Sequence, residues 1–113
     1  MAGAMYRPTW AEVDLSAIRQ NIRAIRSRVG SRVKIMPAVK ADAYGHGAVP
    51  VSLACLESGA DALGVACIEE AIELREAGIT APVLILGCSD PSAADEIVRQ
   101  GIAQMCCDLD CAR

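Results

Sequence analysis

The sequence predicts an α/β fold in which parallel strands alternate with helices. Apolar, strand-like runs begin near residues 33, 61, 83 and 103, and a helix-like segment follows each of the first three. Alternation at this spacing is typical of βα units, whose right-handed crossovers make the strands parallel. The 113 residues allow at most one small domain. Because there is no Phe and there are only one Trp and two Tyr, its core must be built from small aliphatic side chains.

A helix is expected first, over residues 15–29. We expect residues 1–8 to be a flexible lead, with translation starting at Met1 or Met5, and residues 10–13 to be extended. Asp14 is a suitable helix N-cap, and Gly30 fits the position just past the end. Apolar residues recur at helical spacing, at Leu15, Ile18, Ile22, Ile25 and Val29. This face should pack on the sheet, which leaves four arginines in water: Arg19, Arg23, Arg26 and Arg28.

The first parallel strand is expected at residues 33–39. Pro37 is awkward inside it, since proline cannot donate to the ladder, so we expect a local bulge or a gap there. Alternation places four side chains on one side of this strand: Lys34, Met36, Ala38 and Lys40. Lys34 and Lys40 then lie at opposite ends, so the two lysines of the chain cannot share a site.

The remaining elements follow from turn and cap signals. Residues 41–47 should form a loop, and Pro50 suits the first turn of a helix that runs to residue 58. Strands are expected at 62–65, 83–86 and 102–107, with helices after the first two that end near Gly78 and Gly101. Ser89 or Asp90 should cap the second of these helices. The residues after the strands, such as Lys40, Gly87 and Asp108, then share one rim, where α/β barrels place their chemistry.

Two groups of residues could carry chemistry but have simpler interpretations. Glu69 and Glu70 open a helix, where acidic residues favour the dipole, and adjacent helical residues do not face each other as an acid–base pair would. The six cysteines include no Cys-x-x-Cys and lie far in sequence from the single His46, so no metal site is expected. We interpret them as small, buried, free thiols, which implies a reducing compartment, the cytoplasm.

Charge and hydropathy exclude some partners. A net charge of −3 argues against nucleic acid, and no apolar run has the length of a membrane span. The opening MAGAM lacks the basic start and apolar core of a secretory signal.

The segment AVKADAYGHG, residues 38–47, is where we expect the site. Lys40 ends an apolar strand, so it can approach a ligand from a rigid element while apolar neighbours desolvate its amine. Desolvation favours the neutral amine, which is nucleophilic toward a carbonyl. The alternative is a strand-end lysine that simply reaches solvent, since buried lysines without partners are rare.

This segment resembles the cofactor-lysine signature of alanine racemases, which carry pyridoxal phosphate (PLP) on a barrel of parallel strands. Two other stretches resemble the same family: TWAEVDLSAIRQNI at residues 9–22 and LREAGITAPVLILG at residues 74–87. The resemblance implies the N-terminal part of a PLP-binding (β/α)8 barrel, with about four βα units preceded by a helix. Because eight such units need about 250 residues, residues 1–113 would be one portion of the barrel, without its remainder or the C-terminal β domain.

The resemblance also implies roles for individual residues. Lys40 would be the catalytic residue and would bond covalently to PLP, and the Tyr44 hydroxyl would hold the cofactor phosphate. Ala38 and Leu86 would line the pocket near the ring, whereas His46 would hydrogen-bond within the loop or cap the next helix. The Pro37-Ala38 pair departs from the bulkier apolar pair frequent in the family, which puts the pocket shape in doubt. A tyrosine from the partner subunit of a homodimer would carry the second proton, and no residue here matches it.

The implied function is the interconversion of L- and D-alanine, which supplies D-alanine for peptidoglycan. The intact protein would be an isomerase, and the 113-residue chain alone would be inactive, because the arginines that hold the cofactor ring and the substrate carboxylate match no residue here. Three alternatives stay open: another PLP-barrel enzyme such as a serine racemase or an amino-acid decarboxylase, a non-catalytic PLP carrier, and a purely structural fragment.

Overall fold

The fold is a short parallel sheet with helices on one side, in a computed structural model that describes residues 6–113. The strands β1 (Leu63–Val65), β2 (Val83–Ile85) and β3 (Ala103–Gln104) lie in that order and are parallel. The helices are α1 (Leu15–Val29), α2 (Lys40–Gly45), α3 (Ala48–Glu57), α4 (Ile68–Glu76), α5 (Ala94–Arg99) and α6 (Leu109–Ala112), with a 3-10 turn at Pro91–Ala93. This confirms the alternation that the sequence predicts. Residues 1–5 of the expected lead lie outside the described residues.

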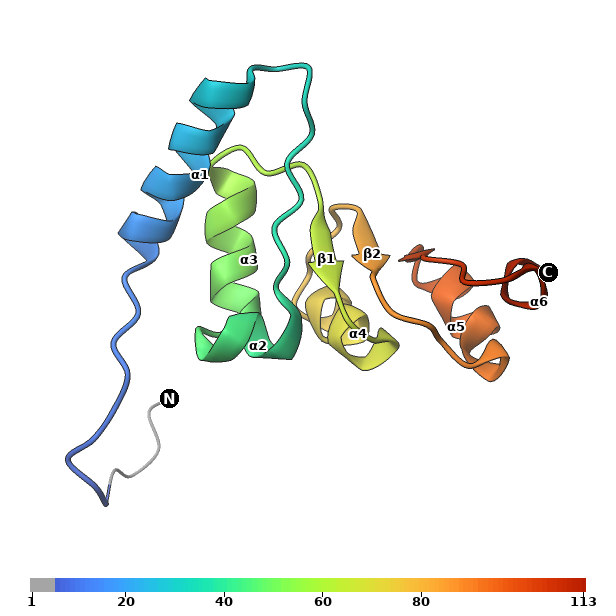
Figure 1. Cartoon of the computed structure of the whole chain (residues 1–113). Coiled ribbons are helices and arrows are strands. Elements are labelled where there is room, and N and C mark those ends of the chain that lie inside the picture. The colour runs from blue at the N-terminus through green and yellow to red at the C-terminus, as the bar shows by residue number, and fades with distance from the viewer. Residues whose placement is uncertain (1–5) are drawn as a thin grey trace.

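The helix α1 has the predicted boundaries but not the predicted partner. The Asp14 carboxylate accepts from the N–H groups of Ser16 and Ala17 at 2.9 and 3.2 Å, and Gly30 follows the helix with a φ of 79°. Figure 1 shows α1 beside α3 and away from the strands, with residues 6–14 as an arm that leaves the body and forms no strand. Because α3 lies between α1 and the sheet, only the first part of the apolar stripe is covered. Ile25 and Val29 are 45% and 36% exposed, so their predicted burial is wrong.

The arginines of α1 are not all in water, as the sequence led us to expect. Arg26 is half-buried, and its guanidinium donates to the Gly59 carbonyl at 2.7 Å and to the Asp61 carboxylate at 2.5 Å. Arg19 forms an ion pair with Glu57 of α3 at 3.3 Å. The Arg26 contacts fix α1 to the loop that enters β1, because one guanidinium offers several donors in a rigid plane, and the Arg19 pair joins α1 to α3.

Residues 33–39 are extended and parallel to β1 but do not form the regular strand that the sequence predicts. The Ile35 carbonyl accepts from Asp61 N–H at 2.8 Å, and the Pro37 carbonyl accepts from Gly64 N–H at 2.9 Å. Val39 N–H donates to the Gly64 carbonyl at 2.8 Å, and the pairing is a single bridge. Pro37 has no N–H to continue the ladder, which accounts for the interruption and agrees with the expected gap.

The two faces of the sheet differ in burial. Four alternating strand residues that face the helices are at most 1% exposed: Leu63, Val65, Val83 and Ile85. The side chains of the other face, among them Met36 and Ala38, are exposed, and Leu84 and Leu86 are half-buried. The molecule is 22 Å across in its thinnest direction, about one sheet plus one layer of helices. One face of the sheet is therefore uncovered.

The later helices begin and end near their predicted positions. In α3 the start is Ala48, two residues before Pro50, and α4 ends at Glu76, just before Gly78. Asp90, not Ser89, caps the segment that starts at Pro91, by accepting from Ser92 N–H at 2.9 Å.

The cysteines are not all free thiols, so that expectation is wrong. Cys88 and Cys107, which follow β2 and β3, form a disulfide with a Cα–Cα distance of 6.6 Å. The other cysteines are free, and of these only Cys55 is buried; its burial raises the pKa of the thiol. Within residues 6–113 no three acidic, His or Cys side chains gather as metal ligands, and no helix has the length and apolarity to cross a membrane.

Candidate active site

The backbone after Lys40 forms a left-handed helical turn, where the sequence predicted a loop. Ala41, Asp42, Ala43 and Tyr44 have φ values of 51 to 55° and ψ values of 40 to 49°. Left-handed helical geometry costs each L-residue roughly 1–2 kcal/mol, and it is rare in residues other than glycine. Four such residues in succession therefore need strong support from their surroundings.

Several backbone hydrogen bonds provide part of this support. Ala43 N–H donates to the Val39 carbonyl at 2.9 Å, and Gly47 N–H donates to the Asp42 carbonyl at 2.9 Å. The Asp42 carboxylate accepts from Ala48 N–H at 2.8 Å, so Asp42 caps α3. Ala43 is buried and belongs to the core. The turn is thereby attached both to the extended segment before it and to the helix after it.

Lys40 and Tyr44 lie at the two ends of this turn. Lys40 is half-buried at the end of the extended segment, and Tyr44 is 62% exposed. Figure 1 shows α2 at the end of the molecule toward which the arrows of β1 and β2 point, next to α3 and α4. Both residues therefore lie on the carboxyl rim of the parallel sheet, as predicted.

Ala38 and Leu86 lie on the uncovered face on either side of Gly64, which the sequence reading did not single out. Gly64 pairs with Ala38 on one side and with Leu84 on the other. A Cβ added to Gly64 would lie 2.9 Å from Leu86 Cδ1 and 3.8 Å from Ala38 Cα. The absence of a side chain at Gly64 lets the Leu86 side chain pack over the Gly64 backbone, so Leu86 and Ala38 form one apolar surface on this face. A glycine inside a strand run was the only sequence signal for it.

His46 and Asp42 divide the roles that the sequence assigned to His46 alone. His46 Nδ1 lies 3.3 Å from the Tyr44 carbonyl oxygen, which is a contact within the loop. The cap on the next helix comes from Asp42. Asp42 lies six residues before Ala48, with the left-handed turn between them. The usual sequence patterns for helix caps therefore do not predict this cap.

The two acidic residues that open α4 point to different partners. The Glu70 carboxylate accepts from Ala41 N–H at 2.5 Å through one oxygen and from Ala66 N–H at 2.8 Å through the other. Glu69 is exposed, and hydrogen bonds to its own backbone N–H and to Cys67 hold the pKa of its carboxyl below the ordinary value. They do not form a carboxylate pair. Sequence reasoning missed the contact of Glu70 with the turn after Lys40.

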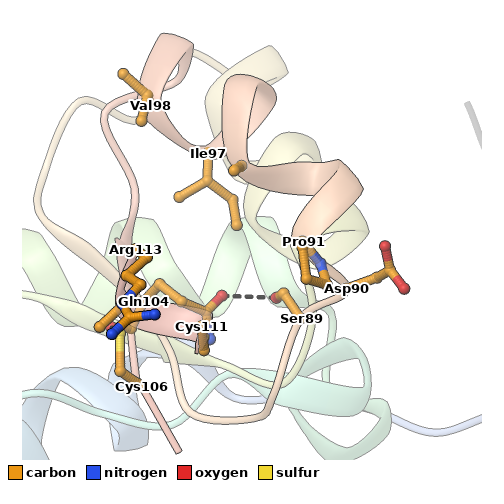
Figure 2. Close-up of a pocket in the computed structure, with 11 residues that line it drawn as sticks. Ser89, Asp90, Pro91, Ile97, Val98, Gln104, Cys106, Cys111 and Arg113 are labelled. Carbon is orange, nitrogen blue, oxygen red and sulfur yellow. Dashed lines mark hydrogen bonds between the residues drawn. The ribbon is translucent and has the colours of Figure 1, made fainter. Parts of the chain in front are cut away.

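A separate pocket of about 250 Å³ lies near the C-terminal end, and neither Lys40 nor Tyr44 lines it. Its walls come from the segment around Pro91, from α5 and from the residues after β3 (Figure 2). The Ser89 hydroxyl donates to Gln104 Oε1 at 2.6 Å along one side. Because it is open and bordered by the last residues of the chain, we do not assign it to the site at Lys40.

The turn at the carboxyl rim carries an amine, Lys40, and a phenol, Tyr44, and the sheet face beside it is apolar. An amine can bond to an aldehyde, a phenol hydroxyl can donate to an anionic group, and an apolar surface can pack against a flat ring. The structure places Lys40 and Tyr44 on the turn at the carboxyl rim, and Ala38 and Leu86 on the uncovered face beside Gly64.

Comparisons with known proteins point to one family. The family model for the alanine racemase N-terminal domain matches residues 13–113. An alanine racemase from Symbiobacterium thermophilum is 53% identical over 96 residues, which cover 85% of this chain and 25% of that protein. One from Caldanaerobacter subterraneus subsp. tengcongensis is 53% identical over 103 residues, or 91% of this chain and 26% of that protein.

A solved structure shows the same fold. The alanine racemase from Bacillus anthracis superposes with a TM-score of 0.88 at 45% identity, over 92% of this chain and 27% of that one. The chain thus spans about a quarter of the length of the curated relatives it matches. Since the family model spans most of the chain and the relatives agree over the same region, the chain belongs to the alanine racemase family.

Proposed function

We propose that the protein to which this chain contributes an N-terminal barrel portion is a PLP-dependent alanine racemase. The observation that carries the proposal is the position of Lys40, half-buried at the end of the extended segment on the carboxyl rim of a parallel sheet. The relatives named alanine racemase support the substrate. The proposal includes the remaining barrel strands and a C-terminal β domain. If alanine is not the substrate, the alternatives are a serine racemase, an amino-acid decarboxylase or a non-catalytic PLP carrier.

The residues present fit PLP. The Lys40 amine would bond to the cofactor aldehyde, and the exposed Tyr44 hydroxyl would donate to the phosphate. Ala38 and Leu86 would line the ring, since both lie on the uncovered apolar face beside Gly64. When bound, PLP withdraws electrons from the α-carbon of an attached amino acid and makes its α-hydrogen acidic.

Lys40 then has a second role in the proposed reaction. With PLP and an amino acid bound, Lys40 would supply a free amine that could take or return a proton on one face of the substrate. Racemisation needs a second proton carrier on the opposite face. We propose, from the resemblance to alanine racemases, that a tyrosine of a partner subunit supplies it in a homodimer.

The cellular context is part of the same proposal. We place the protein in the cytoplasm, where it would supply D-alanine for peptidoglycan. The four free cysteines support a reducing compartment, whereas the Cys88–Cys107 disulfide does not. A net charge of −3 supports a small-molecule substrate over nucleic acid or an anionic membrane surface.

A chimera tests the proposed activity. Residues 1–113 would replace the matching segment of the Bacillus anthracis racemase, which is 45% identical over this region. With PLP present, we expect the chimera to convert L-alanine to D-alanine, measured by chiral chromatography. Lys40→Ala should reduce turnover by at least about 10³-fold, since it removes both the cofactor bond and a proton carrier.

Two controls make the assay specific. Lys34→Ala removes the other lysine, which is exposed and lies at the opposite end of the same segment, and should leave turnover unchanged. The 113-residue chain alone should give no turnover above free PLP. Turnover that survives Lys40→Ala, or a chimera that folds and binds PLP but acts on serine and not on alanine, would contradict the proposal.

A further inference from the structure

Glu70 connects the backbone beside Lys40 to the backbone after β1. One carboxylate oxygen accepts from Ala41 N–H at 2.5 Å, and Ala41 is the residue directly after Lys40. The other oxygen accepts from Ala66 N–H at 2.8 Å, directly after Val65 ends β1. We propose that Glu70 is a positioning residue for Lys40, an inference that rests on the proposed function, in which Lys40 bonds to PLP.

The two hydrogen bonds of Glu70 differ in kind. The bond to Ala66 spans four residues and resembles the return bond of a capping box at the start of α4. The bond to Ala41 spans 29 residues and does nothing for α4. A side chain needed only as a helix cap would not have to accept from Ala41, so the second bond points to a role in the turn.

The turn needs such support because of its geometry. Ala41 is the first of four residues with positive φ, and no side chain other than Glu70 accepts its N–H among the described residues. The later part of the turn is held by Ala43 N–H on the Val39 carbonyl and by Asp42 at α3. Only Glu70 fixes the point where the chain changes from extended to left-handed, one residue after Lys40.

The consequence concerns the direction of the Lys40 side chain. If the Ala41 peptide relaxes toward ordinary backbone angles, the Lys40 Cα–Cβ bond rotates with it and Tyr44 moves relative to the amine. Charged acceptors form stronger hydrogen bonds than neutral ones, so a carboxylate is the suitable group to resist this relaxation. Glu70 touches neither cofactor nor substrate in this account and acts through Lys40.

Two substitutions of Glu70 test its role in positioning Lys40. The amide of Gln keeps one acceptor oxygen, so it can satisfy Ala66 or Ala41 but not both. Glu70→Ala removes both bonds. The matched control is Glu69→Gln, which makes the same charge change on the same turn of α4 without touching Ala41.

The experiment uses the full 113-residue chain and two measurements. The first is hydrogen exchange at single amides by NMR, where we expect Ala41 N–H to exchange about tenfold faster or more in Glu70→Gln and Glu70→Ala, while β2 amides keep their rates. The second is PLP titration followed by borohydride reduction and mass spectrometry. The PLP concentration that half-modifies Lys40 should rise about tenfold in both variants and stay unchanged in Glu69→Gln.

The outcomes separate this inference from the proposed function. Modification of Lys40 at the wild-type PLP concentration in both Glu70 variants would overturn the positioning role. A uniform rise of exchange across β2 and α3 would also overturn it, since it would show a purely structural residue. If the wild-type chain forms no adduct on Lys40, this chain has no preformed PLP site; the chimera then decides the proposed function, and exchange at Ala41 alone decides whether Glu70 holds the turn.

Discussion

At the scale of single residues, the site depends on a backbone conformation that its side chains disfavour. Ala41 to Tyr44 are left-handed, and none of them is glycine. At roughly 1–2 kcal/mol for each residue, the turn stores several kcal/mol that burial of Ala43 and hydrogen bonds must offset. Strain of this kind persists where the surrounding structure over-determines it, often at functional sites.

A glycine at position 41 should therefore stabilise the chain. Ala41 is exposed, so Ala41→Gly removes the Cβ cost and loses no buried contact. We expect a gain of about 0.5–1 kcal/mol after the larger backbone entropy of glycine is subtracted, measured by urea unfolding. The control Ala24→Gly, at an exposed position inside α1, should lose about 1 kcal/mol. A loss in both variants would show that the turn is not left-handed in solution.

The helix caps could be predicted from the sequence, but the left-handed turn after Lys40 could not. The caps Asp14, Gly30 and Asp90 depend on residues within a few positions, and all three are confirmed. The left-handed turn depends on Glu70, 29 residues away, and on the core around Ala43. Nothing in ADAY itself favours positive φ, so the sequence predicted an ordinary loop.

At the scale of elements, side chains hold residues 33–39 in place, because the backbone hydrogen bonds between this segment and β1 are incomplete. Asp61 accepts from Ile35 N–H at 2.7 Å and from Arg26 at 2.5 Å, so one carboxylate joins α1, residues 33–39 and the start of β1. The sequence predicted the extended segment and the difficulty at Pro37. It did not predict the contacts of Arg26, because an arginine on the polar face of a predicted helix is expected to face solvent.

Acid should weaken this junction. The Ile35 N–H bond, followed by Arg26, holds the pKa of Asp61 below its ordinary value of 3.8. Its contribution to stability is therefore complete above that value and is lost as the pH falls through the lowered pKa. We expect the difference in unfolding free energy between wild type and Asp61→Asn to shrink between about pH 5 and pH 2. Asp95→Asn, at an exposed aspartate of α5, serves as the control, and an equal pH dependence for both variants would refute the role of Asp61.

At the scale of the whole molecule, strand spacing predicted the parallel sheet and the shared rim. The face that carries Ala38, Gly64 and Leu86 is uncovered, which fits a barrel portion whose interior side awaits further strands. The Cys88–Cys107 disulfide was not predicted, since it depends on β3 lying beside β2, and the two residues are 19 positions apart. Sequence patterns therefore could not predict contacts that arise only when neighbouring βα units pack together.

The central claim is that Lys40 occupies a preformed PLP site. The most direct measurement incubates the 113-residue chain with PLP, reduces it with borohydride and maps the modified peptides by mass spectrometry. We predict a pyridoxyl adduct on Lys40 and none on Lys34, because Lys40 is half-buried on the same turn as Tyr44, whereas Lys34 is exposed at the other end of the extended segment. An adduct on Lys34, or on both lysines equally, would mean non-specific amine chemistry and would contradict a preformed site in this chain.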